Sequence, residues 1–423
     1  MELVTAIFAE TVRGCNTGGW MNSPPVSRRV LDTPSPAIAE VMGLAGQMTA
    51  LGRRVFSMAQ ATPWYGPPEG ALEALSARLA EPRTSMYSPD EGFLSTREAV
   101  ARDMASRRGI RLDPGTEIHL TVGASQAFLS ALLAVTDPGD RVLLVEPWYF
   151  DHEYAVRFAG LVRDGAAMTA GPGGWEFPME DILGRIPGSR CLVLVDPGNP
   201  TGALLSGGEL DALVEACARS GTFLLLDETY ERFRFAPGSS HPWSAGARPG
   251  HVITFGSFSK TFGMPGWRLG YLFGDSGILG HALKVQDSAV ICPPAPSQIM
   301  LERALESGGW VEERLAGLKS RLDACRSAVR ASDALGWVEP GGGFFAMVRL
   351  PPGVASRDAA RILLLEHGIA AVPGSAFGPA GEGFLRLSFG CLPDADIEPA
   401  MAALSRTGSL GGRGGGEDRA TSC

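Results

Sequence analysis

The residue best suited to covalent chemistry in this sequence is Lys260, which lies in the stretch from Ser257 to Tyr271 (Ser-Phe-Ser-Lys-Thr-Phe-Gly-Met-Pro-Gly-Trp-Arg-Leu-Gly-Tyr). Only two other lysines, Lys284 and Lys319, occur among the 37 lysines and arginines, so positions that need only positive charge are usually arginine. An arginine stays protonated, whereas a lysine amine that is desolvated near other cations can lose its proton and form a Schiff base with an aldehyde. Considered alone, Lys260 is also compatible with an incidental surface lysine in a loop.

Polar groups follow the ends of several apolar runs. The segment Gly123-Ala124-Ser125-Gln126 would open a helix with free backbone amides, which favours phosphate binding, although an ordinary glycine turn with a serine cap gives the same pattern. Asn199 is enclosed by turn-forming residues in Asp196-Pro-Gly-Asn-Pro-Thr-Gly, which would hold its amide rigidly. Asp227 ends an apolar run, where a carboxylate tolerates burial only with a cationic partner.

Aromatic and hydroxyl side chains complete this set. The segment Glu146-Pro-Trp-Tyr-Phe follows another apolar run, and one of its rings could stack on a flat heterocycle, although aromatic residues more often pack in a core. Further groups lie one turn beyond Asp227 or around Lys260: Tyr230, Ser257, Ser259 and Arg268.

Together these groups suit a ligand with a phosphate, a basic ring nitrogen, a phenolic oxygen and an aldehyde. Pyridoxal 5'-phosphate (PLP) has all four. Asp227 would keep the ring nitrogen protonated, and Asn199 and Tyr230 would hydrogen-bond the phenolic oxygen. Lys260 would carry the aldehyde as an imine.

A sheet must position these groups, because each follows a short apolar run. Such runs alternate with helical patterns between about Ala71 and Pro293, and they cover residues 117–122, 141–145, 191–195, 222–226, 252–255 and 269–273. This alternation predicts an α/β fold with a mostly parallel sheet covered on both faces. Ligands of such sheets bind at the carboxyl ends of the strands.

The flanking regions predict a second, smaller α+β domain. We expect a helix over 35–55 with Ser35 as N-cap, a long amphipathic helix over 302–329, and strands near 343–348 and 384–389. The resulting division is an N-terminal arm with part of the small domain, a large PLP-binding domain, a small C-terminal domain and a disordered Gly- and Ser-rich tail, over residues 1–60, 61–296, 297–406 and 407–423 respectively.

Composition excludes several classes of protein. A net charge of -9 gives no basic stripe for nucleic acid, and no apolar run reaches the length that spans a membrane. Glu2 and Glu10 argue against a secretory signal peptide. The seven cysteines are scattered without a CxxC pair, which favours reduced thiols in a cytoplasm, and the six isolated histidines predict no metal site.

The chain resembles the class I/II aminotransferases of PLP fold type I from about Phe56 to Ala403. Three motifs carry this resemblance in the family's order: Asp196-Pro-Gly-Asn-Pro-Thr-Gly, Asp227-Glu-Thr-Tyr, and the lysine stretch from Ser257 to Tyr271. The resemblance implies an aspartate aminotransferase-like fold. Such a fold has a large domain with a mostly parallel sheet of the seven-stranded type, and a smaller α+β domain.

The resemblance also implies roles for individual residues. Lys260 is the Schiff-base lysine, and the phosphate is held by Ser257, Arg268 and the amides of Ala124, Ser125 and Gln126. Tyr149 is the ring-stacking aromatic, in preference to Trp148. Tyr87 reaches the phosphate of a partner subunit, which implies a homodimer, and Arg386 clamps the substrate α-carboxylate.

Two departures from the family pattern concern the substrate. Ala61-Thr62-Pro63 stands where the family has a glycine, although the Ala61 backbone amide could still meet the carboxylate beside Asn199. The segment from Gln286 to Gln298 lacks the arginine that dicarboxylate-specific members use. We therefore do not expect aspartate to be the preferred substrate.

The leading hypothesis is transamination of an amino acid with a 2-oxo acid through a Lys260 Schiff base, with Lys260, Asp227 and Tyr230 as catalytic residues. The same residues would serve an alternative, namely a PLP-dependent lyase, cyclase or γ-replacement enzyme acting on an S-adenosylmethionine-type substrate in a bacterial natural-product pathway. A regulator is disfavoured, because little room for a winged helix precedes Phe56.

Overall fold

The computed structural model describes residues 26–236, 241–408 and 410. The chain divides into two compact units, Met1–Pro34 and Ser35–Cys423. The described part of the first unit contains the short helix α2 (Arg28–Leu31). All features below belong to the second unit.

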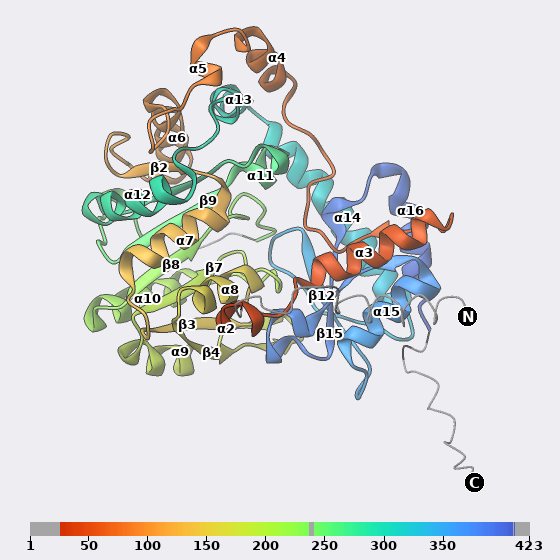
Figure 1. The fold of residues 1–423 in the computed structure, drawn as a ribbon. Coiled ribbons are helices and arrows are strands. Elements are labelled where there is room, and N and C mark those ends of the chain that lie inside the picture. The colour runs from red at the N-terminus through yellow and green to blue at the C-terminus, as the bar shows by residue number, and fades with distance from the viewer. Residues whose placement is uncertain (1–25, 237–240, 409, 411–423) are drawn as a thin grey trace, which may run out of the picture. The chain divides into compact units, whose positions relative to one another are not determined.

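A seven-stranded sheet forms the centre of this unit (Figure 1). β10 is antiparallel to its neighbours β2 and β9, and every other pair is parallel. In spatial order the strands are β2 (Ile118–Thr121), β10 (Gly270–Phe273), β9 (Val252–Ser257), β8 (Phe223–Asp227), β7 (Cys191–Val195), β3 (Arg141–Glu146) and β4 (Val162–Ala167).

Six of these strands confirm the predicted apolar runs, and the mostly parallel α/β sheet is also confirmed. β4 is not among the predicted apolar runs, because its residues Val-Arg-Asp-Gly-Ala-Ala include two charges. β4 lies at the edge of the sheet, where its polar side chains reach solvent.

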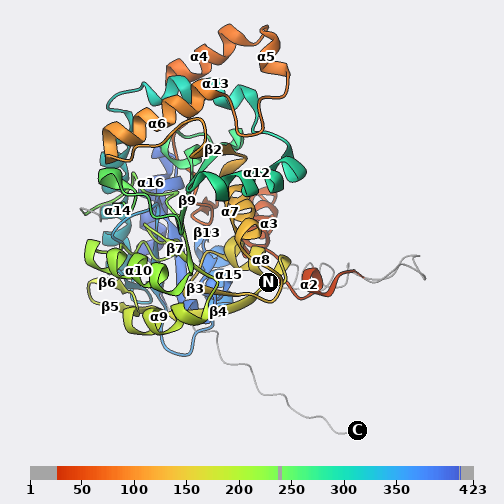
Figure 2. The same ribbon diagram turned by 90° about the vertical axis from the view of Figure 1, so that its left-hand side faces the viewer.

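Helices cover both faces of the large sheet, and Figure 2 shows α7 and α8 on one side of the strands and α10 on the other. Strand residues alternate between two cores: Leu225 packs with one set of helices, and Leu224 and Leu226 pack with the other. The first set is α7 (Gly123–Val135), α8 (Phe150–Phe158) and α12 (Ser276–Val290). The second set is α4 (Glu69–Arg78), α6 (Leu94–Arg108), α9 (Met179–Arg185), α10 (Gly207–Ser220) and α13 (Ala295–Leu305).

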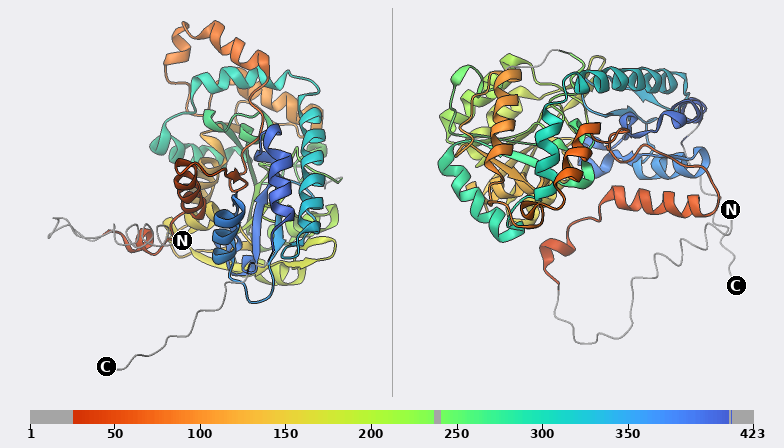
Figure 3. Two further views of the ribbon diagram at one scale, coloured as in Figure 1. Left: turned by 90° about the vertical axis from the view of Figure 1, so that its right-hand side faces the viewer. Right: turned by 90° about the horizontal axis from the view of Figure 1, so that it is seen from above.

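A second, four-stranded antiparallel sheet has its own core, as predicted for an α+β domain. Its strands are β11 (Gly336–Trp337), β12 (Phe345–Arg349), β15 (Phe384–Ser388) and β14 (Val372–Pro373). Its helices, cyan to blue in Figure 3, are α14 (Trp310–Ala331), α15 (Ser356–His367) and α16 (Asp394–Ser405). The expected strands near 343–348 and 384–389 are thus confirmed as β12 and β15.

Two helix predictions need correction. The helix expected over 35–55 is α3 (Ala37–Ala50), which begins after Pro36 without a side-chain cap, so Ser35 is not its N-cap. The helix expected over 302–329 is two helices, α13 and α14, because Gly308 and Gly309 interrupt it and Gly309 has a φ of 76°. The two helices serve different cores, since Leu301 packs with the large sheet and Leu322 with the small one.

Short elements complete the described chain. They are α5 (Pro82–Ser85), α11 (Phe258–Thr261), the paired strands β1 (Phe56–Ser57) and β13 (Ile369–Ala370), the hairpin β5 (Thr169–Gly171) and β6 (Gly174–Glu176), and the 3-10 turns η1 (Ile186–Gly188), η2 (Ser244–Gly246), η3 (Pro265–Trp267), η4 (Gly374–Phe377), η5 (Pro379–Gly381) and η6 (Phe389–Cys391).

Of the tail expected to be disordered, Thr407 and Leu410 are buried, while residues 409 and 411–423 lie outside the described residues. Among the helices of the described residues, none has the length and apolarity needed to cross a membrane.

Candidate active site

A cavity of about 230 Å³ lies at the carboxyl ends of β7, β8 and β9 and is closed by residues of the small sheet and of the segment after β1. The structure brings most of the predicted site residues together on its wall: Ala61, Ala124, Ser125, Tyr149, Asn199, Asp227, Tyr230, Ser257, Lys260, Arg268 and Arg386.

Two predicted residues do not line this cavity. The Gln126 side chain accepts a hydrogen bond from the Val122 amide and donates to Ser130. The role predicted for Gln126 concerns its backbone amide and stays a prediction. Tyr87 is 79% exposed on the surface of the chain. Its predicted role concerns a partner subunit and stays a prediction.

Lys260 lies on α11, a single four-residue helical turn that directly follows β9. Ser257 caps this turn, since its hydroxyl accepts a hydrogen bond from the Ser259 amide at 3.1 Å. Burial lowers the pKa of Lys260 to about 8, and the nearby positive charges of Arg386 and Arg268 contribute to that shift. The unprotonated form that a nucleophile or general base requires is therefore far more populated near neutral pH than for an ordinary lysine.

Asp227 ends β8 as a buried carboxylate whose two oxygens are held separately. Oδ1 accepts hydrogen bonds from the amide and the hydroxyl of Thr229, at 2.9 and 2.6 Å. Oδ2 lies 3.2 Å from Nε2 of His152, which is itself buried against the ring of Phe128. This arrangement orients the carboxylate, so it can hold a cationic ring nitrogen at the cavity.

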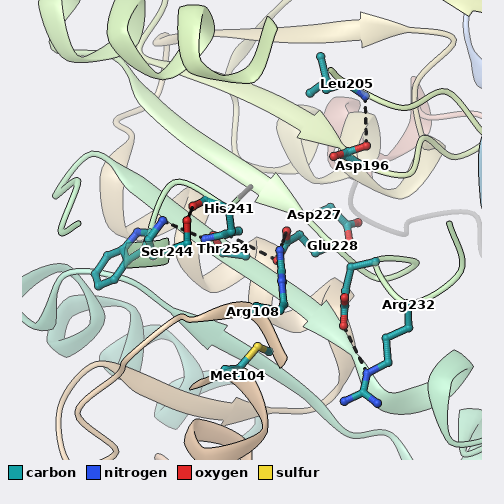
Figure 4. Close-up of polar contacts among 12 residues, drawn as sticks. Met104, Arg108, Asp196, Leu205, Asp227, Glu228, Arg232, His241, Ser244 and Thr254 are labelled. Atoms are coloured by element: carbon teal, nitrogen blue, oxygen red, sulfur yellow. Dashed lines mark hydrogen bonds and ion pairs between the residues drawn. The ribbon is translucent and has the colours of Figure 1, made fainter. Parts of the chain in front are cut away.

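A layer of buried charges lies behind Asp227 (Figure 4). The next residue, Glu228, accepts two hydrogen bonds from Arg108, both at 2.7 Å. Burial alone would raise the pKa of Glu228, but Arg108 and His241 outweigh it and lower that pKa to about 2. Burial also lowers the pKa of His241 to about 4, despite the opposing effect of Glu228. Glu228 is thus ionised and His241 neutral at neutral pH.

The segment 227–234, which begins with Asp227, is held by two further ion pairs. Arg232 binds both oxygens of Asp103 at 2.6 Å, and Arg234 binds Asp196 at 2.6 Å. Because Asp196 opens the turn that carries Asn199, these pairs fix two strand ends relative to one another. The segment that bears Asp227 and Tyr230 is therefore held by ion pairs that do not face the cavity.

An anion cradle lies between the start of α7 and Arg268. Gly123 has a φ of 76°, a conformation that favours glycine, and Nη2 of Arg268 lies 2.6 Å from the position that a Cβ would take there. Arg268 itself has a φ of 51°, a strained conformation for a non-glycine residue that is frequent at functional sites. Ser259 contributes a buried hydroxyl that has no hydrogen-bond partner among the described residues. Helix amides, a guanidinium and a free hydroxyl are the donors that a phosphate needs.

Arg386 on β15 joins the small sheet to the cavity and is 1% exposed. Its Nη1 donates to Oδ1 of Asn199 at 3.0 Å, its Nη2 donates to the carbonyl of Ala59, and its Nε has no partner among the described residues. Burial lowers the pKa of Arg386. A buried guanidinium with a donor to spare can bind a carboxylate.

The two tyrosines on the cavity are neutral donors. Burial raises the pKa of both Tyr149 and Tyr230. Tyr149 donates to Oδ2 of Asp151 at 2.6 Å, which fixes its ring on the cavity wall. Trp148 is buried beside Gly378 under the guanidinium of Arg163 and does not line this cavity.

The cavity is also lined by Ser259, which the sequence placed among the groups around Lys260, and by six residues that the sequence did not single out: Ile38, Gln60, Thr62, His152, Thr229 and Pro265. His152 had a detectable signal, because it follows Tyr149, the N-cap of α8, by three residues, and the centroids of the two rings lie 5.3 Å apart at the start of that helix. Ile38, Gln60 and Thr62 had none, since long-range packing alone brings α3 and the segment after β1 to the cavity.

Comparison with solved structures identifies the fold as aspartate aminotransferase-like, PLP fold type I. N-succinyldiaminopimelate aminotransferase from Mycobacterium tuberculosis superposes with a TM-score of 0.83 at 27% identity, over 90% of this chain and 99% of that one. Aspartate aminotransferase from Thermus thermophilus with maleate gives a TM-score of 0.82, also at 27% identity, with the same coverage. The predicted fold class is thereby confirmed.

The family described as "Aminotransferase class I and II" matches residues 53–404, and the chain belongs to this family. The aromatic aminotransferase ISS1 of Arabidopsis thaliana is 32% identical over 395 residues, which cover 90% of this chain and 95% of that protein. The aspartate/prephenate aminotransferase of Thermus thermophilus is 30% identical, over 90% of this chain and 98% of that protein. The protein is therefore an aminotransferase, one of the PLP-dependent transferases, as the sequence predicted.

Proposed function

We propose that this aminotransferase carries PLP on Lys260 and takes its amino group from an amino acid with an uncharged side chain. The observation that carries the substrate class is the distribution of cations on the cavity. Its lysine and arginines among the described residues are Lys260, Arg268 and Arg386, and each has a role toward the cofactor or the α-carboxylate. None is left for a second carboxylate, and an aromatic donor fits the name of the relative in Arabidopsis thaliana.

The cofactor would be held by the residues at the strand ends. Arg268, Ser257, Ser259 and the amides that begin α7 are suited to its phosphate, and Tyr149 to one face of its ring. Asp227 would hold the proton on the ring nitrogen, while Asn199 and Tyr230 would donate to the phenolic oxygen. Bound in this way, PLP supplies an electron sink for the electrons left at the substrate Cα when it loses its proton.

The protein's own side chains would then bind the substrate and move its proton. Arg386 would bind the α-carboxylate through its free donor, with the Ala61 amide as a second contact. Lys260, with its pKa lowered to about 8, would take the proton from the substrate Cα. It would later deliver a proton to C4', the aldehyde carbon of PLP. The closing segment around Thr62 would exclude water from these groups.

We also propose a homodimer in the cytoplasm. The exposed pair Met86 and Tyr87, at 66% and 79% exposure, is an unusual surface feature that a second copy would cover. Free cysteines at five described positions are consistent with a reducing compartment. Light scattering of the purified protein, with Tyr87→Phe tested for cofactor retention, examines the dimer.

The function is tested by a half-reaction. PLP-loaded protein receives one amino acid at a time without a 2-oxo acid, and pyridoxamine phosphate is measured by mass spectrometry. We expect pyridoxamine phosphate with phenylalanine, tyrosine or another neutral donor, little with aspartate, and none for Lys260→Ala. Absence of pyridoxamine phosphate with every donor, together with eliminated or cyclised products from S-adenosylmethionine, would contradict the proposal.

A further inference from the structure

We infer that Tyr65 is a positioning residue for Lys260, and that it couples the backbone of the lysine turn to helix α14. This inference rests on the proposed role of Lys260 as the reactive amine. Tyr65 belongs to the proline–aromatic segment, residues 60–66 (Gln-Ala-Thr-Pro-Trp-Tyr-Gly), which departs from the family pattern.

The direct contact is a hydrogen bond from the Tyr65 hydroxyl to the backbone carbonyl of Lys260, at 2.7 Å. That carbonyl belongs to a helix of only four residues, so continued helix cannot satisfy it. The amide of Gly263 also donates to this carbonyl, over a longer distance of 3.4 Å. Burial raises the pKa of Tyr65 against the opposing effect of Arg314, so the phenol remains a donor at working pH.

A second observation places the same segment against the lysine turn. Gly263 closes that turn with a φ of 61°, and a Cβ on it would lie 2.4 Å from the carbonyl oxygen of Gly66 and 2.6 Å from that of Tyr65. The backbone of the proline–aromatic segment thus rests directly on Gly263. Side chain and backbone together hold the lysine turn at two points.

The other side of the segment packs on α14. The Tyr65 ring meets the Trp310 ring edge to face at 6.0 Å, and the Arg314 guanidinium lies 3.9 Å from the Trp310 centroid and 5.6 Å from that of Tyr65. Arg321 lies 3.9 Å over the ring of Trp64. These contacts between aromatic rings and cations connect the segment to the small-sheet side of the molecule.

The consequence concerns the distance between the two groups that would handle the substrate. Arg386 donates to the carbonyl of Ala59, which immediately precedes this segment, and Thr62 lines the cavity. The segment therefore spans from Arg386 to the Lys260 turn. Loss of the Tyr65 hydroxyl should loosen that turn, admit water to the amine and misplace it relative to the substrate.

The test compares Tyr65→Phe with a matched control, Tyr154→Phe, which removes a phenol oxygen from the half-buried Tyr154 on α8. Apoprotein is incubated with PLP over a range of pH, reduced with borohydride, and assayed by mass spectrometry for the adduct on Lys260. Because better hydration raises the pKa of a lysine, we expect the pH midpoint of attachment to rise by about 0.5 unit or more in Tyr65→Phe. We also expect kcat to fall about tenfold with KM within about twofold. The control should match the wild type.

A wild-type midpoint and a wild-type kcat for Tyr65→Phe would overturn the inference. If the wild-type protein formed no adduct on Lys260, the proposed function would fail instead, so the two failures are distinguishable. Should Tyr65→Phe not fold, Arg314→Gln decides the matter, because it removes the charge beside the Tyr65 ring and leaves the phenol in place. A smaller rise of the midpoint in Arg314→Gln supports the coupling, and an unchanged midpoint contradicts it.

Discussion

The cavity has two walls that are built on different physical principles. The strand-end wall, formed by the ends of β7, β8 and β9 with the segment 227–234, is fixed by buried ion pairs such as Glu228 with Arg108. The proline–aromatic segment opposite has no ion pair of its own among the described residues and is held by ring contacts and by the Tyr65 hydroxyl. The first wall bears the groups suited to a cofactor, and the second faces the space left for a substrate.

This difference separates the two tasks of an aminotransferase. A cofactor of constant shape benefits from a wall that is rigid before binding. Substrate choice depends on cavity-lining side chains, such as those of Gln60 and Thr62, that can change without disturbing that wall. Tyr65 does not line the cavity, and its hydroxyl instead holds the lysine turn. Arg386 contacts Asn199 of the strand-end wall and the carbonyl of Ala59, which precedes the opposite segment. A substitution of Arg386 therefore tests whether the two walls are independent.

The largest effect should come from removing an ion pair behind the strand-end wall. Glu228→Gln leaves the Arg108 guanidinium buried without its counter-charge, and we expect the free energy of unfolding to fall by about 3–5 kcal/mol. Glu231→Gln is the matched control, because Arg107 keeps Asp103 as a partner, and it should cost about 1 kcal/mol. Urea denaturation measures both. Equal losses would show that the wall does not depend on the Glu228 pair.

Arg386→Lys should give the next largest effect, since lysine cannot serve Asn199, Ala59 and a carboxylate in the same planar geometry. We expect kcat/KM for the amino donor to fall at least about 100-fold, with the cofactor absorbance retained. Arg349→Lys, at an exposed position on β12, should stay close to the wild type. Steady-state kinetics with a neutral donor measures kcat/KM for both variants. Equal values for Arg386→Lys and Arg349→Lys would contradict the role of Arg386 in binding the carboxylate.

Acid should weaken the strand-end wall selectively. The folded-state pKa of His241, about 4, lies below its ordinary value of 6.5, so the unfolded chain binds a proton that the folded chain does not. Stability is then lost as pH falls from 6.5 toward 4, at about 1 kcal/mol per pH unit from this group. Glu228, with a pKa of about 2 against an ordinary 4.5, adds a further loss below pH 4.5.

Thermal unfolding between pH 6.5 and 4.5 measures this slope. His241→Gln should show a shallower loss of stability than the wild type, because glutamine takes up no proton. A slope unchanged by the substitution would place the acid sensitivity elsewhere in the molecule.

The smallest effect is expected on the opposite wall. Gln60→Ala removes a side chain that lines the cavity and does not belong to the strand-end wall, so we expect KM for the amino donor to change by about two- to tenfold. Attachment of PLP to Lys260 should be unaffected. Gln47→Ala, at an exposed position on α3, serves as the control. A loss of cofactor attachment in Gln60→Ala would show that the two walls are not separable.

The strand-end wall could be predicted from the sequence because its signals are local. Asp227 and Asn199 stand directly after apolar runs, and Lys260 is a rare lysine among arginines, so residue type and position already suggested their place. β4 could not be predicted from an apolar run, because an edge strand need not be apolar. The break between α13 and α14 was not predicted, because the amphipathic pattern continues across Gly308 and Gly309.

The opposite wall could not be predicted, because its contacts join distant parts of the chain. The hydrogen bond from Tyr65 to Lys260 spans 195 positions. The residues beside Trp64 and Tyr65 in the sequence give no sign of their contacts with Arg321 and Arg314. His152 lies between these cases, since its spacing from Tyr149 was readable but its contact with Asp227 required the packing of α8 on the sheet.

The central claim is that Lys260 is the amine that binds the cofactor. Incubation with PLP near pH 8, borohydride reduction and peptide mapping by mass spectrometry tests it directly, since Lys284 and Lys319 are the only other lysines in the chain. We predict a near-stoichiometric adduct on Lys260 at low cofactor concentration, and its loss in Lys260→Ala. An adduct that formed equally on Lys284 or Lys319, or that survived in Lys260→Ala, would contradict the account.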